Sequence, residues 1–309
     1  MRIIVTGAAG LIGYHLCRRL LDERHQVIGV DNFSTGQRSN AEQLGQACGF
    51  HLLEHDICQP VRLDGPVDLI YNLACPPSPV DFATRPLEIL RTCSDGVRTM
   101  LELAFDKKAV FLQASTSECY GDPLVNPQPE TYWGNVNPIG PRSCYDEGKR
   151  FAEALTMSCH RQHGLATRIV RIFNTYGPRM RADDGRALPT FINQALRGEA
   201  LTVFGDGSQT RSFCYVEDLV DGIVRLAGSD IVEPVNIGSQ EEITIGQVAR
   251  EVVELTCSQS TIEYRPLPQD DPKVRRPDNS RARQLLGWQP VTDRRTGFAR
   301  TIEHFRSRL

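Results

Sequence analysis

Short apolar runs alternate with amphipathic stretches through the first half of the chain. Apolar runs bounded by polar residues predict buried strands, and apolar residues repeated every three or four positions predict helices. The strands are expected at residues 2–6, 26–31, 51–55, 67–74, 109–115 and 166–173, and the helices at residues 11–24, 87–105 and 145–163. Strands that alternate with helices in this way indicate an α/β fold built on a doubly wound parallel sheet.

A second, smaller region is expected after Tyr176, where the alternation stops and Gly, Pro, Asp and Arg gather in loops. Residues 1–175 are predicted to form the first domain, with a returning segment near 213–240. Residues 176–212 and 241–309 are predicted to form a C-terminal domain that binds the substrate. A chain of 309 residues is long enough for such a division.

Composition limits the kinds of molecule that the protein is expected to bind and the cell compartment in which it is expected. A formal net charge of -3 provides no basic surplus for nucleic acid or an anionic membrane. No apolar run approaches the roughly 20 residues of a membrane span, and Gly7 interrupts the first run too early for a signal peptide. The ten cysteines are scattered without a C-x-x-C pair, so we expect free thiols and a cytoplasmic protein. The proline-rich stretch 266–277 is expected to be an ordered binding loop.

Three glycines between the first predicted strand and the first predicted helix have the spacing G-x-x-G-x-x-G. In a Rossmann-type fold Gly7 permits the tight turn, Gly10 lets backbone N–H groups approach a pyrophosphate, and Gly13 allows helix and strand to pack closely. A glycine-rich turn without a ligand is the alternative interpretation. Asp31 ends the second strand, where a carboxylate binds ribose hydroxyls and repels a 2'-phosphate. We therefore predict NAD, and not NADP, as the cofactor.

Further cofactor contacts are expected near the carboxyl ends of the strands, where open α/β sheets bind their ligands. Most lie in the glycine loop, in the polar loop after the second strand, and after the third and fourth strands, and the others are the Tyr-Lys pair and Arg186 further along the chain. The full set is Gly7, Gly10, Leu11, Ile12, Gly13, Asp31, Asn32, Ser34, Thr35, Asp56, Ile57, Leu73, Cys75, Thr92, Tyr145, Lys149 and Arg186.

Tyr145 and Lys149 are four residues apart and therefore share one face of a predicted helix. The pKa of the Tyr145 phenol must fall from about 10 to near 7 for it to accept a proton at neutral pH, and a nearby ammonium and a positive nicotinamide both favour that change. In an isolated helix, a surface Tyr-Lys pair is the simpler interpretation. Here the pair follows a strand end, residues 114–121, whose hydroxyl groups can reach the same substrate.

These motifs resemble the extended short-chain dehydrogenase/reductase family, through TGAAGLIG, the hydroxyl-rich strand end before Tyr120 and the string YDEGK. A narrower resemblance, to UDP-glucuronic acid decarboxylases, runs from residue 2 to about residue 305. It is carried by STSECYGDP, NPIGPRSCYDEGKR, RIFNTYGPRM, DDGR, LTVFGDGSQTRSF, QDDP and LGWQP.

The resemblance implies a reaction with NAD as a catalytic cofactor. Tyr145 takes the proton of the sugar 4-hydroxyl while a hydride passes to NAD, and the resulting 4-keto sugar has its carboxylate β to a ketone. Such an acid readily loses carbon dioxide, and Thr116 donates a hydrogen bond to the enolate oxygen. Return of a proton and of the hydride yields UDP-xylose. The resemblance places Glu118 near sugar carbons 4 and 5, where it orders a water or moves a proton, and Arg275 near the carboxylate.

The resemblance also implies the substrate contacts. Backbone groups of Leu201 and Val203 are expected to pair with uracil, and the ring of Phe204 to stack on it. Guanidinium groups suit phosphate oxygens. The full substrate set is Arg91, Ser117, Asn174, Leu201, Val203, Phe204, Arg211 and Arg276. A homodimer is expected because similar helices pair across a two-fold axis in the family.

Three alternatives and one departure stay open. A nucleotide-sugar 4,6-dehydratase needs an acid beside Glu118, where this chain has Ser117; a 4-epimerase needs only oxidation and rotation; and a non-catalytic NAD-sensing protein needs neither. The departure is Cys93, because the decarboxylases usually have Asn at this position. If the absence of this Asn slows the return of the hydride from NADH, the enzyme releases UDP-4-keto-pentose.

Overall fold

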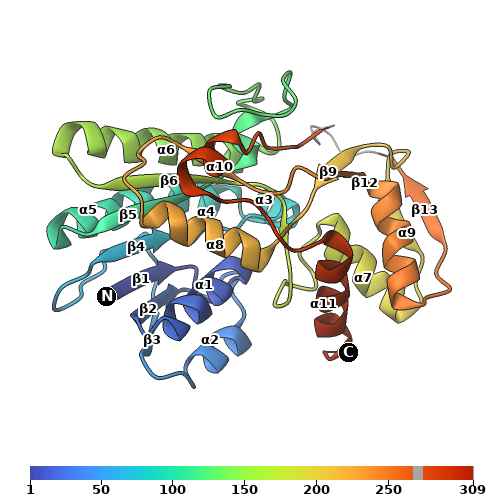
Figure 1. The fold of residues 1–309 in the computed structure, drawn as a ribbon, viewed down its shortest axis with the longest axis horizontal. Helices are drawn as coiled ribbons and strands as arrows, with labels where there is room; N and C mark the ends of the chain where they lie inside the picture. Colours follow the sequence, from blue (N-terminus) through green and yellow to red (C-terminus); the bar gives the residue numbers. More distant parts are fainter. Residues whose placement is uncertain (267–273, 309) are drawn as a thin grey trace.

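The computed structural model describes residues 1–266 and 274–308. Its centre is a seven-stranded sheet with the order β11-β6-β5-β4-β1-β2-β3, in which every neighbouring pair is parallel (Figure 1). The strands are β1 Arg2–Thr6, β2 Gln26–Asp31, β3 Phe50–Glu54, β4 Leu69–Asn72, β5 Val110–Thr116, β6 Thr167–Ile172 and β11 Val235–Ile237. The predicted doubly wound α/β fold is confirmed.

Helices cover both faces of this sheet. One face carries α1 and α8, with α2 beside α1 and α10 beside α8, and the other carries α5 and α6, with α3 and α4 nearby. Their bounds are α1 Leu11–Asp22, α2 Arg38–Leu44, α3 Pro79–Thr84, α4 Pro86–Arg91, α5 Val97–Lys107, α6 Ser143–His163, α8 Val216–Ala227 and α10 Ser280–Leu286. A short 3-10 helix, η2 Ser117–Tyr120, follows β5 directly.

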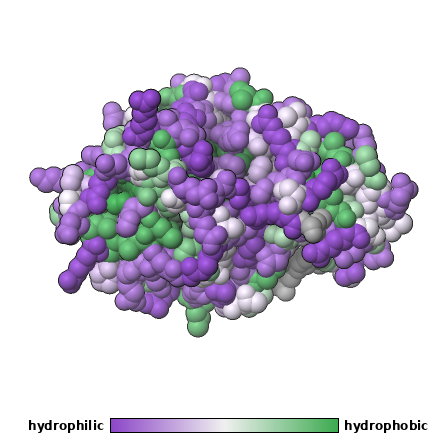
Figure 2. Space-filling view, turned by 90° about the horizontal axis from the view of Figure 1, so that it is seen from below, coloured by the Kyte–Doolittle hydropathy of each residue, from purple (hydrophilic) through white to green (hydrophobic). Residues whose placement is uncertain are grey.

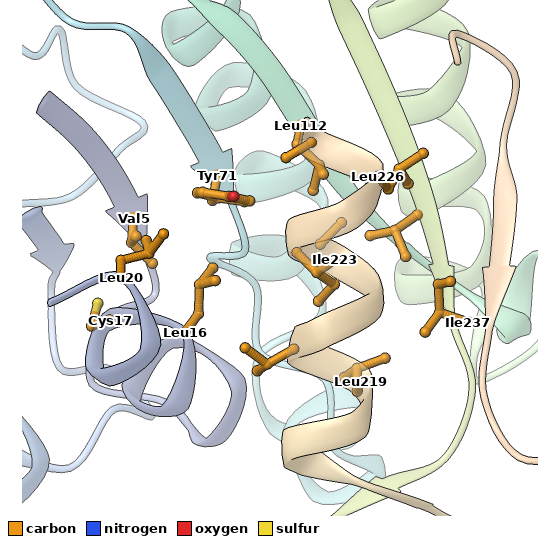
Figure 3. Packing of buried hydrophobic residues seen from close by; sticks show 14 of the residues in the cluster. Val5, Leu16, Cys17, Leu20, Tyr71, Leu112, Leu219, Ile223, Leu226 and Ile237 are labelled. Atoms are coloured by element: carbon orange, nitrogen blue, oxygen red, sulfur yellow. The ribbon is translucent and has the colours of Figure 1, made fainter. Parts of the chain in front are cut away.

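The sheet is apolar on both faces because each face lies under helices. Successive residues of β1 point to opposite sides, so Ile3 and Val5 belong to the core under α1 and α8, while Ile4 belongs to the core under α5. In Figure 3, Leu219 and Leu226 lie on the side of α8 that faces Ile237, and Leu16 of α1 lies on its opposite side. This packing holds the carboxyl ends of the strands at one edge.

The second region is built from α7, α9 and α11 around short strands. Its elements are β7 Thr175–Tyr176, α7 Ala187–Arg197, β8 Leu201–Phe204, β9 Thr210–Ser212, β10 Cys214–Tyr215, β12 Glu242–Thr244, α9 Ile245–Thr256, β13 Ile262–Arg265 and α11 Arg294–Arg306. Phe191, Val203, Val248 and Phe298 are among the buried side chains of its separate core. The chain returns to the first region between these elements, because α8 packs on the large sheet and β11 pairs with β6.

Two expected elements differ from the structure. The helix expected at 87–105 is interrupted by a π-helical segment, η1 Thr92–Gly96, between α4 and α5. The strand expected at 67–74 ends at Asn72, because the N–H groups of Leu73 and Ala74 donate to the Thr6 hydroxyl and not to a neighbouring strand. Both differences lie next to the cavity described below.

The surface seen in Figure 2 is mostly hydrophilic, with apolar side chains gathered in smaller areas. Among residues 1–266 and 274–308, no helix combines the length and the apolar character that a membrane crossing requires.

Candidate active site

A cavity of about 680 Å³ lies between the carboxyl edge of the large sheet and the second region. It extends from the glycine loop at Gly7 to Phe204 and Arg265 on the paired strands β8 and β13. A cleft at the carboxyl ends of parallel strands is where an α/β fold places its ligands. The cavity is therefore the candidate active site.

The glycine loop closes one end of the cavity. Gly7 has a φ of +69°, and a Cβ on Gly13 would lie 2.0 Å from the Gly7 carbonyl oxygen, so neither position accommodates a side chain. Gly10 is the N-cap of α1 and supplies no side chain to cap the first turn. The N–H groups of that turn consequently point toward the cavity end, which suits a pyrophosphate.

Asp31 is held in place by backbone donors on both sides. One carboxylate oxygen accepts the Ala9 N–H at 2.9 Å, and the other accepts the Phe33 N–H at 2.8 Å. Burial raises the pKa of Asp31, and these two hydrogen bonds oppose the change. A carboxylate oxygen has more than one lone pair, so Asp31 retains acceptor capacity for ribose hydroxyls.

Tyr145, Lys149 and Thr116 meet where α6 crosses the end of β5. The Lys149 ammonium donates to the Ala114 carbonyl at 2.9 Å and lies 5.8 Å from the centre of the Tyr145 ring. Phe82 stacks on that ring with centroids 4.9 Å apart. Burial raises the pKa of Tyr145, and the Lys149 charge only partly opposes this. The downward shift expected for a proton acceptor therefore depends on a further positive charge, such as the nicotinamide.

Glu118 is clamped between two guanidinium groups. Its Oε1 accepts from Arg275 at 2.8 Å and its Oε2 accepts from Arg142 at 2.6 Å. Burial alone would raise the pKa of Glu118, but Arg275 and Arg142 lower it to about 2. Arg275 also approaches the Asn174 amide oxygen at 3.3 Å. Glu118 is thus an ionised acceptor at neutral pH, which favours ordering a water over donating a proton.

Arg142 is a cavity residue that the sequence analysis missed. It precedes α6 as its N-cap residue, where a cation is disfavoured by the positive end of the helix dipole. An arginine at a helix N-terminus was therefore a signal in the sequence, because such a cation needs a nearby anion to compensate the unfavourable interaction with the helix dipole. The anion is Glu118, which lies 24 residues earlier in the chain.

Most of the predicted site residues line this one cavity. They are Gly7, Gly10, Leu11, Ile12, Gly13, Asp31, Asn32, Ser34, Thr35, Asp56, Ile57, Leu73, Cys75, Thr92, Thr116, Ser117, Glu118, Tyr145, Lys149, Asn174, Arg186, Phe204, Arg211 and Arg275.

Four predicted substrate residues are not brought to the cavity wall. Arg91 is the correction that matters most: its side chain is 52% exposed and its guanidinium lies 3.8 Å from the Asp95 carboxylate on the solvent side of the helix. The side chains of Leu201 and Val203 are buried in the second core, but Thr202 between them lines the cavity, so the expected backbone contacts with uracil stay a prediction. Arg276 lies beside the cavity, with its guanidinium 3.1 Å from the Glu242 carboxylate.

Part of the predicted binding loop lies outside the described residues. The QDDP string and most of the stretch 266–277 fall there, whereas Arg275 is described and buried. Across the described ranges, no group of three or more His, Cys, Asp or Glu side chains is arranged to hold a metal ion.

Comparison with known proteins places this geometry in a family. Residues 3–238 match the model of the NAD dependent epimerase/dehydratase family. UDP-glucuronic acid decarboxylase 6 of Arabidopsis thaliana is 51% identical over 310 residues, covering 100% of this chain and 90% of the relative. UDP-glucuronic acid decarboxylase 1 of Danio rerio is 49% identical over 308 residues, covering 100% of this chain and 73% of the relative.

Solved structures share the fold at lower identity. UDP-glucuronic acid 4-epimerase of Bacillus cereus, in complex with UDP-glucuronic acid and NAD, superposes with a TM-score of 0.88 at 28% identity over 100% of both chains. UDP-glucose 4-epimerase of Thermotoga maritima superposes with a TM-score of 0.90 at 28% identity, over 100% of this chain and 99% of the other. The prediction of NAD as cofactor is confirmed at the level of the family. The chain belongs to the NAD dependent epimerase/dehydratase family and is similar along its whole length to the UDP-glucuronic acid decarboxylases.

Proposed function

We propose that this protein decarboxylates UDP-glucuronic acid with NAD as a catalytic cofactor, through a UDP-4-keto intermediate, and yields UDP-xylose. The observation that carries the proposal is the Arg142-Glu118-Arg275 arrangement beside Tyr145 in the cavity, in which Glu118 and Arg275 are buried. Oxidation at carbon 4 requires Tyr145 and Lys149 alone. A guanidinium pair beyond them suits a substrate that carries its own carboxylate.

The glycine loop and Asp31 are suited to hold the pyrophosphate and the adenosine ribose of NAD. When bound, NAD supplies the hydride acceptor and a positive ring. The residues at the other end of the cavity suit a uridine diphosphate: Phe204 is an exposed ring at the cavity wall, and Arg211 is a buried cation nearby. The positive charge of this guanidinium is complementary to the negative charge of the diphosphate oxygens.

Three side chains are assigned to the reacting carbon atoms. Tyr145 accepts the proton of the 4-hydroxyl, and Lys149 stabilises the phenolate that makes this possible. The Thr116 hydroxyl lies at the end of β5 and donates to the oxygen on carbon 4, where negative charge develops as carbon dioxide leaves. Glu118, held ionised, accepts a hydrogen bond from a water or from the sugar.

Arg275 and Arg142 have a second task in this proposal. Each already binds one oxygen of Glu118. Nε and Nη2 of Arg275 have no hydrogen-bond partner among the described residues, so Arg275 has donors for a substrate carboxylate, and the charge of Arg142 adds to the attraction. A carboxylate held near two cations binds well. Its departure as neutral carbon dioxide leaves the electron pair in the sugar enolate, whose oxygen is near Thr116.

The alternatives differ in the residue that they require beside Glu118. A 4,6-dehydratase needs an acid to protonate the leaving hydroxyl, and Ser117 has no proton of carboxyl-like acidity. A 4-epimerase is the nearest structural alternative, but the arginine clamp would then have no decarboxylation to support. UDP-4-keto-pentose is a second product that the same reaction gives if hydride return is slow. Cys93 bears on this step because it replaces the Asn that the resemblance leads one to expect.

The experiment incubates purified protein with UDP-glucuronic acid and NAD, follows absorbance near 340 nm, and identifies products by mass spectrometry. UDP-xylose without accumulated NADH supports the full cycle, and UDP-4-keto-pentose with stoichiometric NADH supports an incomplete one. A product of unchanged mass indicates epimerisation and contradicts the proposal. The absence of both product and absorbance change contradicts any catalytic function. A Tyr145→Phe variant is the control for hydride transfer at this site.

We also propose a homodimer formed through α4, α5 and α6. Leu87, Leu90, Phe105 and Phe151 on these helices are exposed apolar side chains, which is typical of a surface that another subunit covers. Light scattering at micromolar concentration should give twice the monomer mass, and the monomer mass contradicts the proposal. A cytoplasmic location stays a prediction.

A further inference from the structure

Two cysteines lie side by side at the wall of the cavity. The sulfur atoms of Cys75 and Cys93 are 3.6 Å apart, and both are free thiols. Cys75 lies between β4 and α3 and lines the cavity, whereas Cys93 lies in the π-helical segment η1 and is only 2% exposed. One sulfur is thus at a surface that small molecules reach, and the other is directly behind it.

The packing around Cys93 directs its sulfur toward Cys75. Gly148 of α6 is so close that a Cβ there would lie 3.2 Å from the Cys93 sulfur. Phe82, Ile89 and Tyr145 complete an apolar cluster around it. The segment that carries Cys93 is a π turn, a local distortion that is frequent at functional sites.

The electrostatic surroundings distinguish the two thiols. A hydrogen bond with Cys93 lowers the pKa of Cys75, burial opposes this, and the Lys149 ammonium supports it against Asp81 and Glu88. The same hydrogen bond and burial raise the pKa of Cys93. A thiol whose pKa is lowered beside a thiol whose pKa is raised is the arrangement of an attacking and a resolving cysteine.

We propose that Cys75 and Cys93 are a redox modification site, which hydrogen peroxide entering the cavity converts into a reversible disulfide. The Cys75 thiolate attacks one peroxide oxygen, so that an S–O bond forms, the O–O bond breaks, and the leaving hydroxide takes up a proton to become water. The Cys93 sulfur then attacks the Cys75 sulfenic acid. An S–S bond forms, hydroxide leaves, and the Cys93 thiol proton completes a second water. Two sulfurs lose two electrons in total, and the peroxide gains them.

The geometry permits this step with a small movement. A disulfide has its sulfurs about 2.05 Å apart, so the pair must close by about 1.5 Å. Closure draws Cys75 away from the cavity wall and converts its thiol, which lies near the Lys149 charge, into a disulfide. We therefore expect the oxidised protein to bind NAD about tenfold more weakly. A dithiol reductant restores the starting state by thiol-disulfide exchange.

The test treats the reduced, folded protein with hydrogen peroxide, blocks remaining thiols, and analyses peptides without reduction. The expected result is a cross-linked peptide pair containing Cys75 and Cys93 that disappears after dithiothreitol. Calorimetry of NAD binding before and after oxidation measures the loss of affinity. Neither readout involves the sugar substrate, so failure here is distinguishable from failure of the proposed decarboxylation.

Variants make the assignment specific. In Cys93→Asn the cross-link cannot form, and Cys75 should accumulate as a sulfenic acid that dimedone labels; Cys75→Ser should abolish both products. Cys144→Ser is the matched control, because it removes another buried thiol of the same cluster and should leave the cross-link intact. The proposal is overturned if peroxide that oxidises the exposed Cys48 leaves Cys75 and Cys93 unlinked. A cross-link with unchanged NAD affinity overturns the expected effect on the cofactor site.

Discussion

The ion pair between Arg275 and Glu118 provides the sharpest test of the site. Arg275→Met keeps the length of the side chain and removes its charge. Complete loss of a buried partner costs about 3–5 kcal/mol, but Glu118 keeps its 2.6 Å bond to Arg142. The remaining loss is that of one hydrogen bond to a charged group, so we expect the free energy of unfolding at pH 7 to fall by about 2 kcal/mol.

The pH dependence has a defined sign. Glu118 has a pKa of about 2 in the folded protein against an ordinary value of 4.5, so its ionisation stabilises the fold above pH 4.5. This stabilisation is on the order of 3 kcal/mol and is lost as the pH falls from 4.5 toward 2. In the Arg275→Met variant, the pKa of Glu118 in the folded protein moves back toward 4.5. The variant should therefore lose less stability than the wild type over that interval.

The assay is denaturant unfolding of the wild type, Arg275→Met, Glu118→Gln and the double variant at pH 7. The double-mutant cycle should give a coupling energy of about 2 kcal/mol. Arg276→Met is the matched control, because its ion pair with Glu242 is partly exposed and should contribute less than about 1 kcal/mol. In the enzyme assay, Arg275→Met should lower kcat by about 10²-fold or more. A coupling energy below about 0.5 kcal/mol would refute the reasoning.

Three further predictions concern α6 and the cofactor end of the cavity. Burial, with a contribution from the Glu118 charge, raises the pKa of Asp146 to about 8. The stability of the wild type should therefore fall as the pH rises from 4 to 8. Relative to the wild type, the Asp146→Asn variant should gain up to about 1.4 kcal/mol of stability per pH unit, measured by urea unfolding. Gly13→Ala should lose more than about 3 kcal/mol of stability because its Cβ overlaps the Gly7 carbonyl, whereas Gly10→Ala should cost about 1 kcal/mol in the same assay. Asp31→Asn should weaken NAD binding about tenfold by calorimetry and reduce the preference over NADP.

Each of these has an outcome that contradicts it. A constant stability difference between Asp146→Asn and wild type from pH 4 to 8 excludes titration of this carboxyl near 8. Equal stability losses for the two glycine variants contradict the overlap between a Cβ at position 13 and the Gly7 carbonyl. An Asp31→Asn protein that binds NAD as tightly as the wild type and still rejects NADP shows that another group selects the cofactor.

Local spacing alone was sufficient to predict the sheet, the glycine loop and the pairing of Tyr145 with Lys149. A strand-to-helix turn leaves N–H groups exposed in the same way wherever it occurs, and residues four apart share a helix face whatever the helix packs against. Asp31 was likewise predictable, because it ends a strand next to that loop. These features depend on contacts within one supersecondary unit.

Only the tertiary structure decided the electrostatics of the site. Glu118 meets Arg142 and Arg275 from 24 and 157 residues away, and no spacing rule connects such positions. Arg91 points outward because its helix face is set by the π segment and by the packing of α4 against α6, not by its distance from the glycine loop. The meeting of Cys75 with Cys93 has the same origin. Periodicity determines which face of an element is buried, but which side chains meet across two buried faces is determined by how those elements pack.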